Sequence, residues 1–594
     1  ILIMEKAFEK AGIGIAANPV HSFPKKFTHV TTGTFMQFGL ATVMEVPKSH
    51  TKCNHKTFMR SFPLKRPLLS NINIHKQAYF VPYRTVWEPW SDFREDVPHN
   101  QPAGTGIIAH TPLIDLTTLV SLFKTSYYST GTATMPSDLE HGCDFVTKNG
   151  NVNNYYTFTN YGRWAYKLFC SMGLRIPFAS TLGKDATIDA LPFLAVAKVY
   201  LDYFFPNQYA HYGIFATIDG IFQRQVTYTL TQGEIDTILN AMYKVSYGSD
   251  YFISAFDSPL MAAHGVQSGD FQITDVSLKD VSGVDVAVSS VIDQAPNGTP
   301  IAHGQDDDMV FNFSQYVDSH LKALSRYIKR HSLAGSRALT RYLADWGVTL
   351  DADKLKRCYK LGECTFPVQV GDVIAQSDTY NADTGEGAQL GDYAGRSVAY
   401  NGDFSFDFDT KEDGLIVVTY SIVPSVSYVQ GIHRYWFHKT KLDFLNGDFD
   451  GLSVREIRQC ELFAGTKRAV DMDKLFAFIP TYAEYKIDYD VQSGDFAVDT
   501  KNLGLFGFES ARLFEDSLGS DAFNVTHSLN FIQGNDSLQY NRIFFEDEGL
   551  ADKFVLIHRA EFDSQMPALP LWDSYDFEDG KQKLKMSVNG SKDN

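Results

Sequence analysis

Residues 74–82 read Ile-His-Lys-Gln-Ala-Tyr-Phe-Val-Pro, and Ile74, Ala78 and Phe80 share one face if successive side chains alternate. Such alternation is typical of a β-strand. The run at 415–423, Leu-Ile-Val-Val-Thr-Tyr-Ser-Ile-Val, is rich in β-branched residues and predicts a strand covered on both faces. Together the two stretches predict a sheet inside a β-rich core.

A third strand is predicted close to the C-terminus, where Phe554, Leu556, His558, Ala560 and Phe562 alternate with more polar residues. Strand candidates cluster near residues 27–85 and again near 475–565. Loop-like stretches rich in Gly, Asp, Asn, Ser and Thr lie between them, at 98–160, 265–308 and 376–403. A sandwich built from strands of both ends, with large insertions, fits this order better than a row of separate domains.

Helices are predicted at four places. Thr231-Gln-Gly-Glu234 has the pattern of a capping box and precedes an apolar stripe at helical spacing, Ile235, Ile238, Leu239 and Met242. Similar stripes predict helices near 191–205, 321–328 and 339–346. The fold class expected from all of this is mainly β with a few helices.

Composition limits the function. The chain has 594 residues, of which 44% are hydrophobic and 14% aromatic, and a formal net charge of −17. Because a protein that sheathes nucleic acid alone is expected to be basic, DNA contacts here must come from local patches or a basic partner. Six sparse cysteines without a Cys-x-x-Cys pair predict reduced, mostly buried thiols. No stretch is apolar enough for a membrane helix, so no membrane insertion is expected. The chain begins with Ile1, and we expect residues upstream.

Seven segments resemble, in one order, the major capsid proteins of the Microviridae, especially the gokushovirus branch. Pro206 departs from an Arg-Asp pair usual in that family. The matching segments are His75–Trp90, Leu191–Phe193 with Phe205–Gln208, Asp250–Pro259, Gly335–Val348 with Leu361–Gly362 and Ile374–Ser377, Gly391–Gly395, Gly414–Gly431, and Ala483–Tyr485 with Val491–Phe496.

The resemblance implies a single capsid domain over 1–594, an eight-stranded antiparallel jelly-roll β-sandwich of the viral coat type with long loop insertions. Copies would assemble through pentamers into an icosahedral shell around a circular single-stranded DNA genome, in the host bacterial cytoplasm. Implied partners are a small basic DNA-binding protein, a pilot protein and a host-cell surface receptor. The insertions 98–165 and 265–308 are candidates for a projection near the threefold axes, and 576–594 forms a C-terminal tail that resembles nothing we can name.

Tyr83, Trp87 and Trp90 follow the strand at 74–82 and are candidate subunit contacts, because aromatic side chains supply large contact area at low entropic cost. The alternative is that they cap the core of their own subunit, which is the commoner fate of large aromatics.

Arg60, Lys65 and Arg66 are the best candidates for DNA contact, since they flank the aromatic Phe62 and lie near the N-terminus, which by analogy faces inward in shells. Other basic clusters are Lys25, Lys26 and His29, and Arg326, Lys329, Arg330 and His331. The alternative for all of them is a solvated face or a salt bridge.

No catalytic residue, cofactor or metal ligand is assigned. Asp306–Asp308 and Asp407, Asp409 and Asp413 could offer oxygen ligands to calcium, but most acidic runs are solvated loops. Nucleophile-elbow, phosphate-loop and zinc-protease motifs are absent from the sequence, so we expect no enzyme. A β-sandwich carbohydrate-binding protein or glycosidase is the alternative, which would need two carboxylates about 5 to 10 Å apart in a cleft. A trimeric fibre protein is a third possibility, although such proteins usually show repeats.

Overall fold

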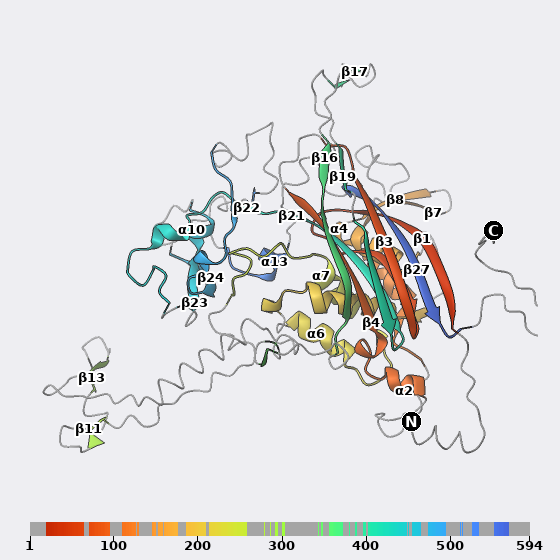
Figure 1. Ribbon diagram of the computed structural model, residues 1–594, viewed down its shortest axis with the longest axis horizontal. Helices are drawn as coiled ribbons and strands as arrows, with labels where there is room; N and C mark the ends of the chain where they lie inside the picture. Colours follow the sequence, from red (N-terminus) through yellow and green to blue (C-terminus); the bar gives the residue numbers. More distant parts are fainter. Residues whose placement is uncertain are drawn as a thin grey trace, which may run out of the picture.

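The chain was analysed as a computed structural model (Figure 1). The structure describes residues 20–64, 71–95, 108, 110–125, 127–129, 145–149, 152–158, 160–175, 186–209, 213–257, 278–279, 285–286, 292–294, 300–302, 343, 346–347, 356–371, 379–380, 387–388, 396–399, 402–447, 450, 454–464, 473–494, 511–512, 514, 525–533, 544 and 552–568. In this part of the chain no helix has both the length and the apolar character needed to cross a bilayer.

The first sheet is antiparallel, and its strands come from both ends of the chain. Strand β27 lies between β1 and β3, β20 and β19 pair with different parts of β3, and β16 follows β19. The alternating burial along β3 shows that one face of this sheet points into the core. The strands are β1 (His21–Gly33), β3 (Ser49–Ser61), β16 (Gln369–Gly371), β19 (Arg396–Ala399), β20 (Phe404–Thr410) and β27 (Phe554–Met566).

The second sheet is also antiparallel, in the order β15, β4, β21, β2. Every residue of β21 is buried, because one face of the sheet packs on the first sheet and the other is covered by helices. Gly39 on β2 leaves room for the ring of Tyr420, its partner on the neighbouring strand β21, since a Cβ there would meet that ring at 2.3 Å. The strands are β2 (Gly39–Val46), β4 (Ile72–Pro82), β15 (Tyr359–Pro367) and β21 (Gly414–Pro424).

The strand order is that of a jelly roll. In chain order, β1, β2, β3 and β4 alternate between the two sheets, β15 then pairs with β4 in the second sheet, and β20, β21 and β27 alternate again, so that each sheet receives four of these strands: β1-β27-β3-β20 and β15-β4-β21-β2. This is the arrangement of two interlocked Greek keys, which is common in viral coats. The mainly β sandwich predicted from the sequence is thus confirmed.

The longest insertion, between β4 and β15, supplies the helices over the second sheet. Helix α5 packs on β4 and β21, and α4 packs on β2. Its elements are η1 (Tyr83–Thr85), α2 (Trp90–Glu95), β5 (Leu113–Asp115), α3 (Leu116–Thr125), β6 (Tyr127–Ser129), β7 (Phe145–Asn149), β8 (Val152–Phe158), α4 (Asn160–Ser171), β9 (Thr187–Asp189), α5 (Leu191–Val199), the π-helical η3 (Tyr200–Phe204), η4 (Asn207–Tyr209), α6 (Gly213–Phe222), β10 (Thr229–Leu230), α7 (Gln232–Met242), β11 (Leu278–Lys279), β12 (Asp285–Val286), β13 (Ile292–Gln294) and β14 (Pro300–Ala302).

A second insertion, between β21 and β27, forms a smaller group of short elements around α10 (Figure 1). Phe256 of the first insertion pairs with Phe478 of β24 in an antiparallel bridge, so the two insertions pack together. The elements are β22 (Ser427–Tyr428), η8 (Arg434–Phe437), β23 (Val454–Arg458), α10 (Gln459–Leu462), β24 (Leu475–Pro480), η9 (Ala483–Tyr485), β25 (Asp490–Val491), β26 (Ala511–Arg512) and α13 (Leu529–Ile532). The short β17 (Thr379–Tyr380) and β18 (Gly387–Ala388) lie earlier, between β16 and β19.

Most of the local predictions are confirmed. Strands occupy 74–82, 415–423 and 554–562, and helices begin at Leu191 and after the Thr231 capping box. The expectation for 475–565 was wrong in part, because β24 pairs with β23 outside the sandwich. The predicted helix near 321–328 and nearly all of that near 339–346 lie outside the described residues.

Candidate functional site

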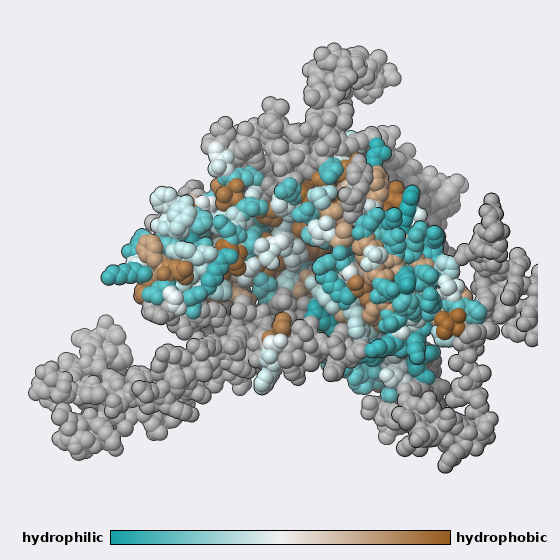
Figure 2. Space-filling model, in the orientation of Figure 1, coloured by the Kyte–Doolittle hydropathy of each residue, from teal (hydrophilic) through white to brown (hydrophobic). Residues whose placement is uncertain are grey.

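The outward face of the first sheet is the most exposed strand surface among the described residues. Side chains at paired positions of neighbouring strands form rows across this face, and the charge and polarity of the rows change along the strands (Figure 2). Figure 2 shows that this face is largely hydrophilic with smaller hydrophobic areas.

At one end of this face the rows are basic and apolar. Arg559 on β27 lies beside Lys56 on β3, and Ile557 lies beside the exposed Phe58. The next outward position on β3 is Arg60, which is also exposed. Within the part of the chain that the structure describes, neither Arg559 nor Arg60 forms an ion pair. Cationic groups beside an exposed ring are what a single nucleic-acid strand uses for phosphate contact and stacking.

At the other end the charges compensate each other. Lys26 pairs with Glu561 at 3.4 Å and Lys52 pairs with Asp407 at 3.6 Å, and all four side chains line an open groove of about 570 Å³. His50 Nε2 also contacts Asp407 Oδ1 at 2.9 Å. Because Glu561 and Asp407 each face a lysine, while Asp563 in the same groove accepts a hydrogen bond from Ser22, this half of the face has no excess of positive charge for a phosphate chain.

Only some of the predicted basic residues lie in the described part of the chain. Arg60 lies on the outward face, whereas Lys65 and Arg66 lie outside the described residues, as do Arg326, Lys329, Arg330 and His331. Lys26 points outward, but His29 turns inward and its Nδ1 lies 2.8 Å from the carbonyl oxygen of Ala41. Arg559, Lys56 and Phe58 were missed by the sequence analysis, although the outward positions of β3 alternate as Lys52, Asn54, Lys56, Phe58 and Arg60.

A polar cluster lies on the opposite, inward face of the same strands. The Lys76 ammonium on β4 is fully buried and donates to the Thr57 hydroxyl at 3.0 Å, to the carbonyl oxygen of His55 at 3.2 Å and to that of Gly402. Thr57 Oγ1 in turn contacts His558 Nδ1 at 3.0 Å. These bonds join β3, β4 and β27 across the sandwich.

Burial sets the protonation of this cluster. It lowers the pKa of Lys76 from 10.5 to about 7, partly opposed by Cys364, Asp403 and Cys53. Burial, with the Lys76 charge, lowers the pKa of His55 from 6.5 to about 3. The pKa of His558 falls well below its usual value for the same reason, with His55, His29 and Lys76 nearby. Near neutral pH the histidines are therefore uncharged.

The three predicted aromatic contacts lie at the start of the first insertion. Tyr83 is 3% exposed and Trp87 is not exposed at all, and both belong to the apolar core beneath the helices. Trp90 is partly buried and packs on Tyr83, with ring centroids 4.8 Å apart. Trp87 thus fills the core of its own subunit, as the alternative interpretation expected. A contact between these residues and a neighbouring copy stays a prediction.

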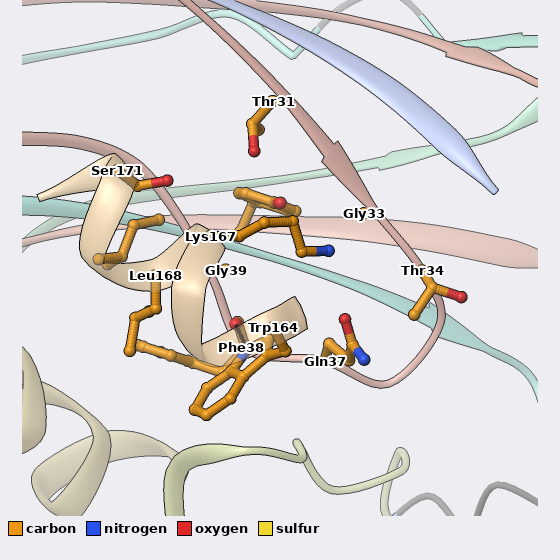
Figure 3. Close-up of a pocket in the computed structure, with 12 residues that line it drawn as sticks. Thr31, Gly33, Thr34, Gln37, Phe38, Gly39, Trp164, Lys167, Leu168 and Ser171 are labelled. Carbon is orange, nitrogen blue, oxygen red and sulfur yellow. Dashed lines mark hydrogen bonds between the residues drawn. The ribbon is translucent and has the colours of Figure 1, made fainter. Parts of the chain in front are cut away.

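Helix α4 docks on the turn between β1 and β2 around a cavity of about 20 Å³, large enough for one water molecule (Figure 3). The Trp164 indole donates to the carbonyl oxygen of Phe38 at 2.6 Å, and Lys167 Nζ lies 2.7 Å from Asp552 Oδ1 just before β27. Since Lys167 is largely buried, this ion pair ties the first insertion to both ends of the sandwich.

Among the described residues, the carboxylates and thiols form no metal-binding cluster. No three His, Cys, Asp or Glu side chains there lie close enough together to hold a metal ion. Asp407 and Asp409 both contact His50, and Asp306–Asp308 lie outside the described residues. The five cysteines in the described part are all free, and three of them are buried.

A jelly-roll sandwich with helices over one sheet and long insertions is an architecture that viral coat proteins share with other classes, such as lectin domains and cupins. The comparison with protein families leads to the viral coat proteins: the family model of the phage capsid protein (F protein) matches residues 18–117 and 186–518, well over half of the chain. The chain therefore belongs to this capsid protein family, and the resemblance to Microviridae major capsid proteins is confirmed at that level.

The family match leaves out two regions. Residues 118–185, which include α4 and overlap the candidate insertion 98–165, lie between the matched parts, and residues after 518 follow them. The candidate insertion 265–308 lies within the matched range. No curated protein matches the chain.

Proposed function

We propose that this chain is the major coat protein of a gokushovirus-like phage, and that its copies form an icosahedral shell around a circular single-stranded DNA genome. The observation that carries the proposal is the coincidence of a jelly-roll strand order with the capsid family match. Jelly-roll subunits tile closed shells because each rigid wedge meets complementary edges of its neighbours. The role is structural and needs no enzyme activity.

The shell requires further contacts. The proposal includes a small basic DNA-binding protein, a pilot protein and a host receptor as partners, and 98–165 or 265–308 as the outward projection. Assembly would take place in the host cytoplasm and the product would be the virion. The net charge of −17 supports a separate basic partner, because the subunit alone cannot neutralise a packaged genome.

Assembly of the purified chain tests the main proposal. We expect pentamers and closed particles in analytical ultracentrifugation and electron microscopy. Monomers under all conditions of salt, pH and concentration, with or without single-stranded DNA, would contradict it.

For the DNA contact we propose the basic end of the outward face, with Arg60, Arg559 and Phe58. Their exposure and the lack of ion pairs at the two arginines among the described residues support this choice. Lys65 and Arg66 remain part of the proposal, as the next basic residues after Arg60 in the sequence.

The DNA proposal predicts a graded effect of substitution. Arg60→Ala with Arg559→Ala should weaken binding of single-stranded DNA and reduce the slope of log affinity against log salt by about 0.7 for each lost phosphate contact. Lys26→Ala is the matched control, because Lys26 lies on the same face but pairs with Glu561. Fluorescence anisotropy at several salt concentrations measures both values, and equal slopes for the three proteins would contradict the assignment.

A further inference from the structure

The insertion between β21 and β27 carries an unusual number of exposed large apolar side chains. Eight of them, each 40% to 70% exposed, lie on the segments 435–445 and 485–491 and are called the apolar patch below: Tyr435, Trp436, Leu442, Phe444, Leu445, Tyr485, Ile487 and Val491. In Figure 2 hydrophobic residues are visible on the surface over the region of α10, β23 and β24. Contiguous apolar surface of this kind marks interaction sites in soluble proteins.

The side chains of the patch are connected. The rings of Tyr435 and Trp436 lie 5.6 Å apart between centroids. His438 contacts both Phe444 and Tyr485, at 5.3 and 6.0 Å, and so joins the two segments. His433 likewise contacts both Tyr435 and Tyr489, at 4.3 and 5.6 Å, so ring contacts join the two segments of the patch at two places.

The backbone beneath the patch is fixed by buried polar contacts. The Arg434 guanidinium donates to the Glu461 carboxylate at 2.7 Å, and both side chains are buried. The Asp443 carboxylate accepts from the backbone N–H groups of Lys439 and Thr440 at 2.9 and 2.6 Å. These N–H groups lower the pKa of Asp443 to about 2, so the turn holds over a wide pH range. A surface that is already ordered loses little entropy on binding.

The charges around the apolar patch limit which kind of molecule can bind to it. Lys439 and Lys441 are exposed on the first segment, in a chain whose net charge is −17. Asp488 and Asp490 are exposed on the second segment, so the border of the patch carries charges of both signs, and a second copy of this chain, with 53 basic and 70 acidic residues, can offer partners to both. Nucleic acid fits less well, because four of the eight apolar side chains are aliphatic and Asp488 and Asp490 lie on the second segment, where they would repel phosphates.

We infer that the apolar patch is a contact between two copies of this chain, in which Tyr435 and Trp436 pack into the neighbour while Lys439 and Lys441 face its carboxylates. The inference rests on the proposed function, since a shell supplies that neighbour. Tyr and Trp at the centre of a patch are the residues that dominate binding energy at interfaces.

Assembly assays with matched variants test the inference. Trp436→Ala should raise the concentration needed for assembly at least tenfold, Ile487→Ala should raise it less, and Ile214→Ala should leave it unchanged. Ile214 on α6 is the control, because its exposure of 43% is close to the 40% of Ile487. Circular dichroism and thermal unfolding should be the same for all four proteins, since the side chains are exposed. Normal assembly of the Trp436 variant would overturn the inference alone, whereas failure of the unmodified chain to assemble would overturn the proposed function.

Photo-crosslinking identifies the occupant directly. A benzoylphenylalanine at position 435, activated in assembled particles, should yield crosslinks between two copies of the chain, located by mass spectrometry. Crosslinks only to DNA or only to a different protein would overturn the inference. Lys439→Glu with Lys441→Glu should reduce assembly most at low salt, and an unchanged salt dependence would contradict the role of the basic rim.

Discussion

The two sheets of the sandwich differ in what lies on their outer faces. Strand β21 is buried along its whole length, since α5 covers the side that does not face the first sheet. Strand β3 is buried only at every second residue, and its outward side chains meet solvent. The same architecture thus contains one strand, β21, that is buried on both faces and largely apolar, and one sheet whose outer face is available for binding. A strand that is buried on both faces needs apolar residues at nearly every position. A strand with one solvated face can carry polar and charged residues there, and these can bind a partner.

The largest expected effect is a difference in stability between the two sheets. In each sheet one side chain that points away from the interior of the sandwich is truncated. Leu415→Ala on β21 should lower the free energy of unfolding by about 2–5 kcal/mol, because it leaves a cavity under the helices. Phe58→Ala on β3, whose side chain is 39% exposed, should cost less than about 1 kcal/mol. Urea unfolding of unassembled subunits measures both, and equal losses would contradict the comparison.

A second prediction concerns the polar layer between the sheets. Because burial lowers the pKa of Lys76 to about 7, unfolding takes up a proton between pH 7 and 10.5, and stability rises with pH in that window. The slope contributed by this group is at most about 1.4 kcal/mol per pH unit. Lys76→Met should lose that slope, while the exposed control Lys52→Met keeps it. Urea unfolding at pH 7, 8 and 9 gives the slopes, and parallel curves for all three proteins would refute the prediction.

A third prediction applies on the acid side. The pKa of His55 is lowered to about 3, so the unfolded chain takes up a proton at this site below pH 6.5 while the folded chain stays neutral. Stability should therefore fall as the pH drops from 6.5 towards 3. His55→Gln should make this fall shallower, measured by thermal unfolding between pH 4 and 7. A substitution at the exposed His110 serves as the control and should change nothing.

The smallest effect is expected on the solvated face. Lys26 and Glu561 form an ion pair at 3.4 Å with both side chains at least half exposed. Lys26→Ala should change the free energy of unfolding by no more than about 0.5 kcal/mol, since exposed pairs contribute little. A loss above about 1 kcal/mol in urea unfolding would show that this face stabilises the sandwich after all.

Much of the fold was predictable because local periodicity follows burial. The β21 run and the alternation at 554–562 identified two strands of the sandwich, and Thr231 with Glu234 identified the start of α7. The pairing of β27 between β1 and β3 could not be derived from such patterns, since register across several hundred residues leaves no local signal.

The functional surfaces were harder to predict than the strands. Arg60 was found as part of a basic cluster in sequence, but Arg559 on the same face comes from a strand about 500 residues away. Trp87 could not be told apart from a surface tryptophan, because composition does not reveal which side of a turn is covered by α2 and the following helices. The apolar patch has a local signal, the aromatic and aliphatic residues of 435–445 without a strand or helix pattern, which composition alone did not single out.

The position of β27 has a consequence for biosynthesis. Strands β1 and β3 leave the ribosome early, yet their common partner is the last strand of the sandwich and ends at Met566. The first sheet therefore cannot close until β27 has left the ribosome, and the nascent chain carries unpaired strand edges until then. A sandwich without β27 lacks the strand that joins β1 to β3, so we expect chains truncated before β27 to be excluded from the proposed shell.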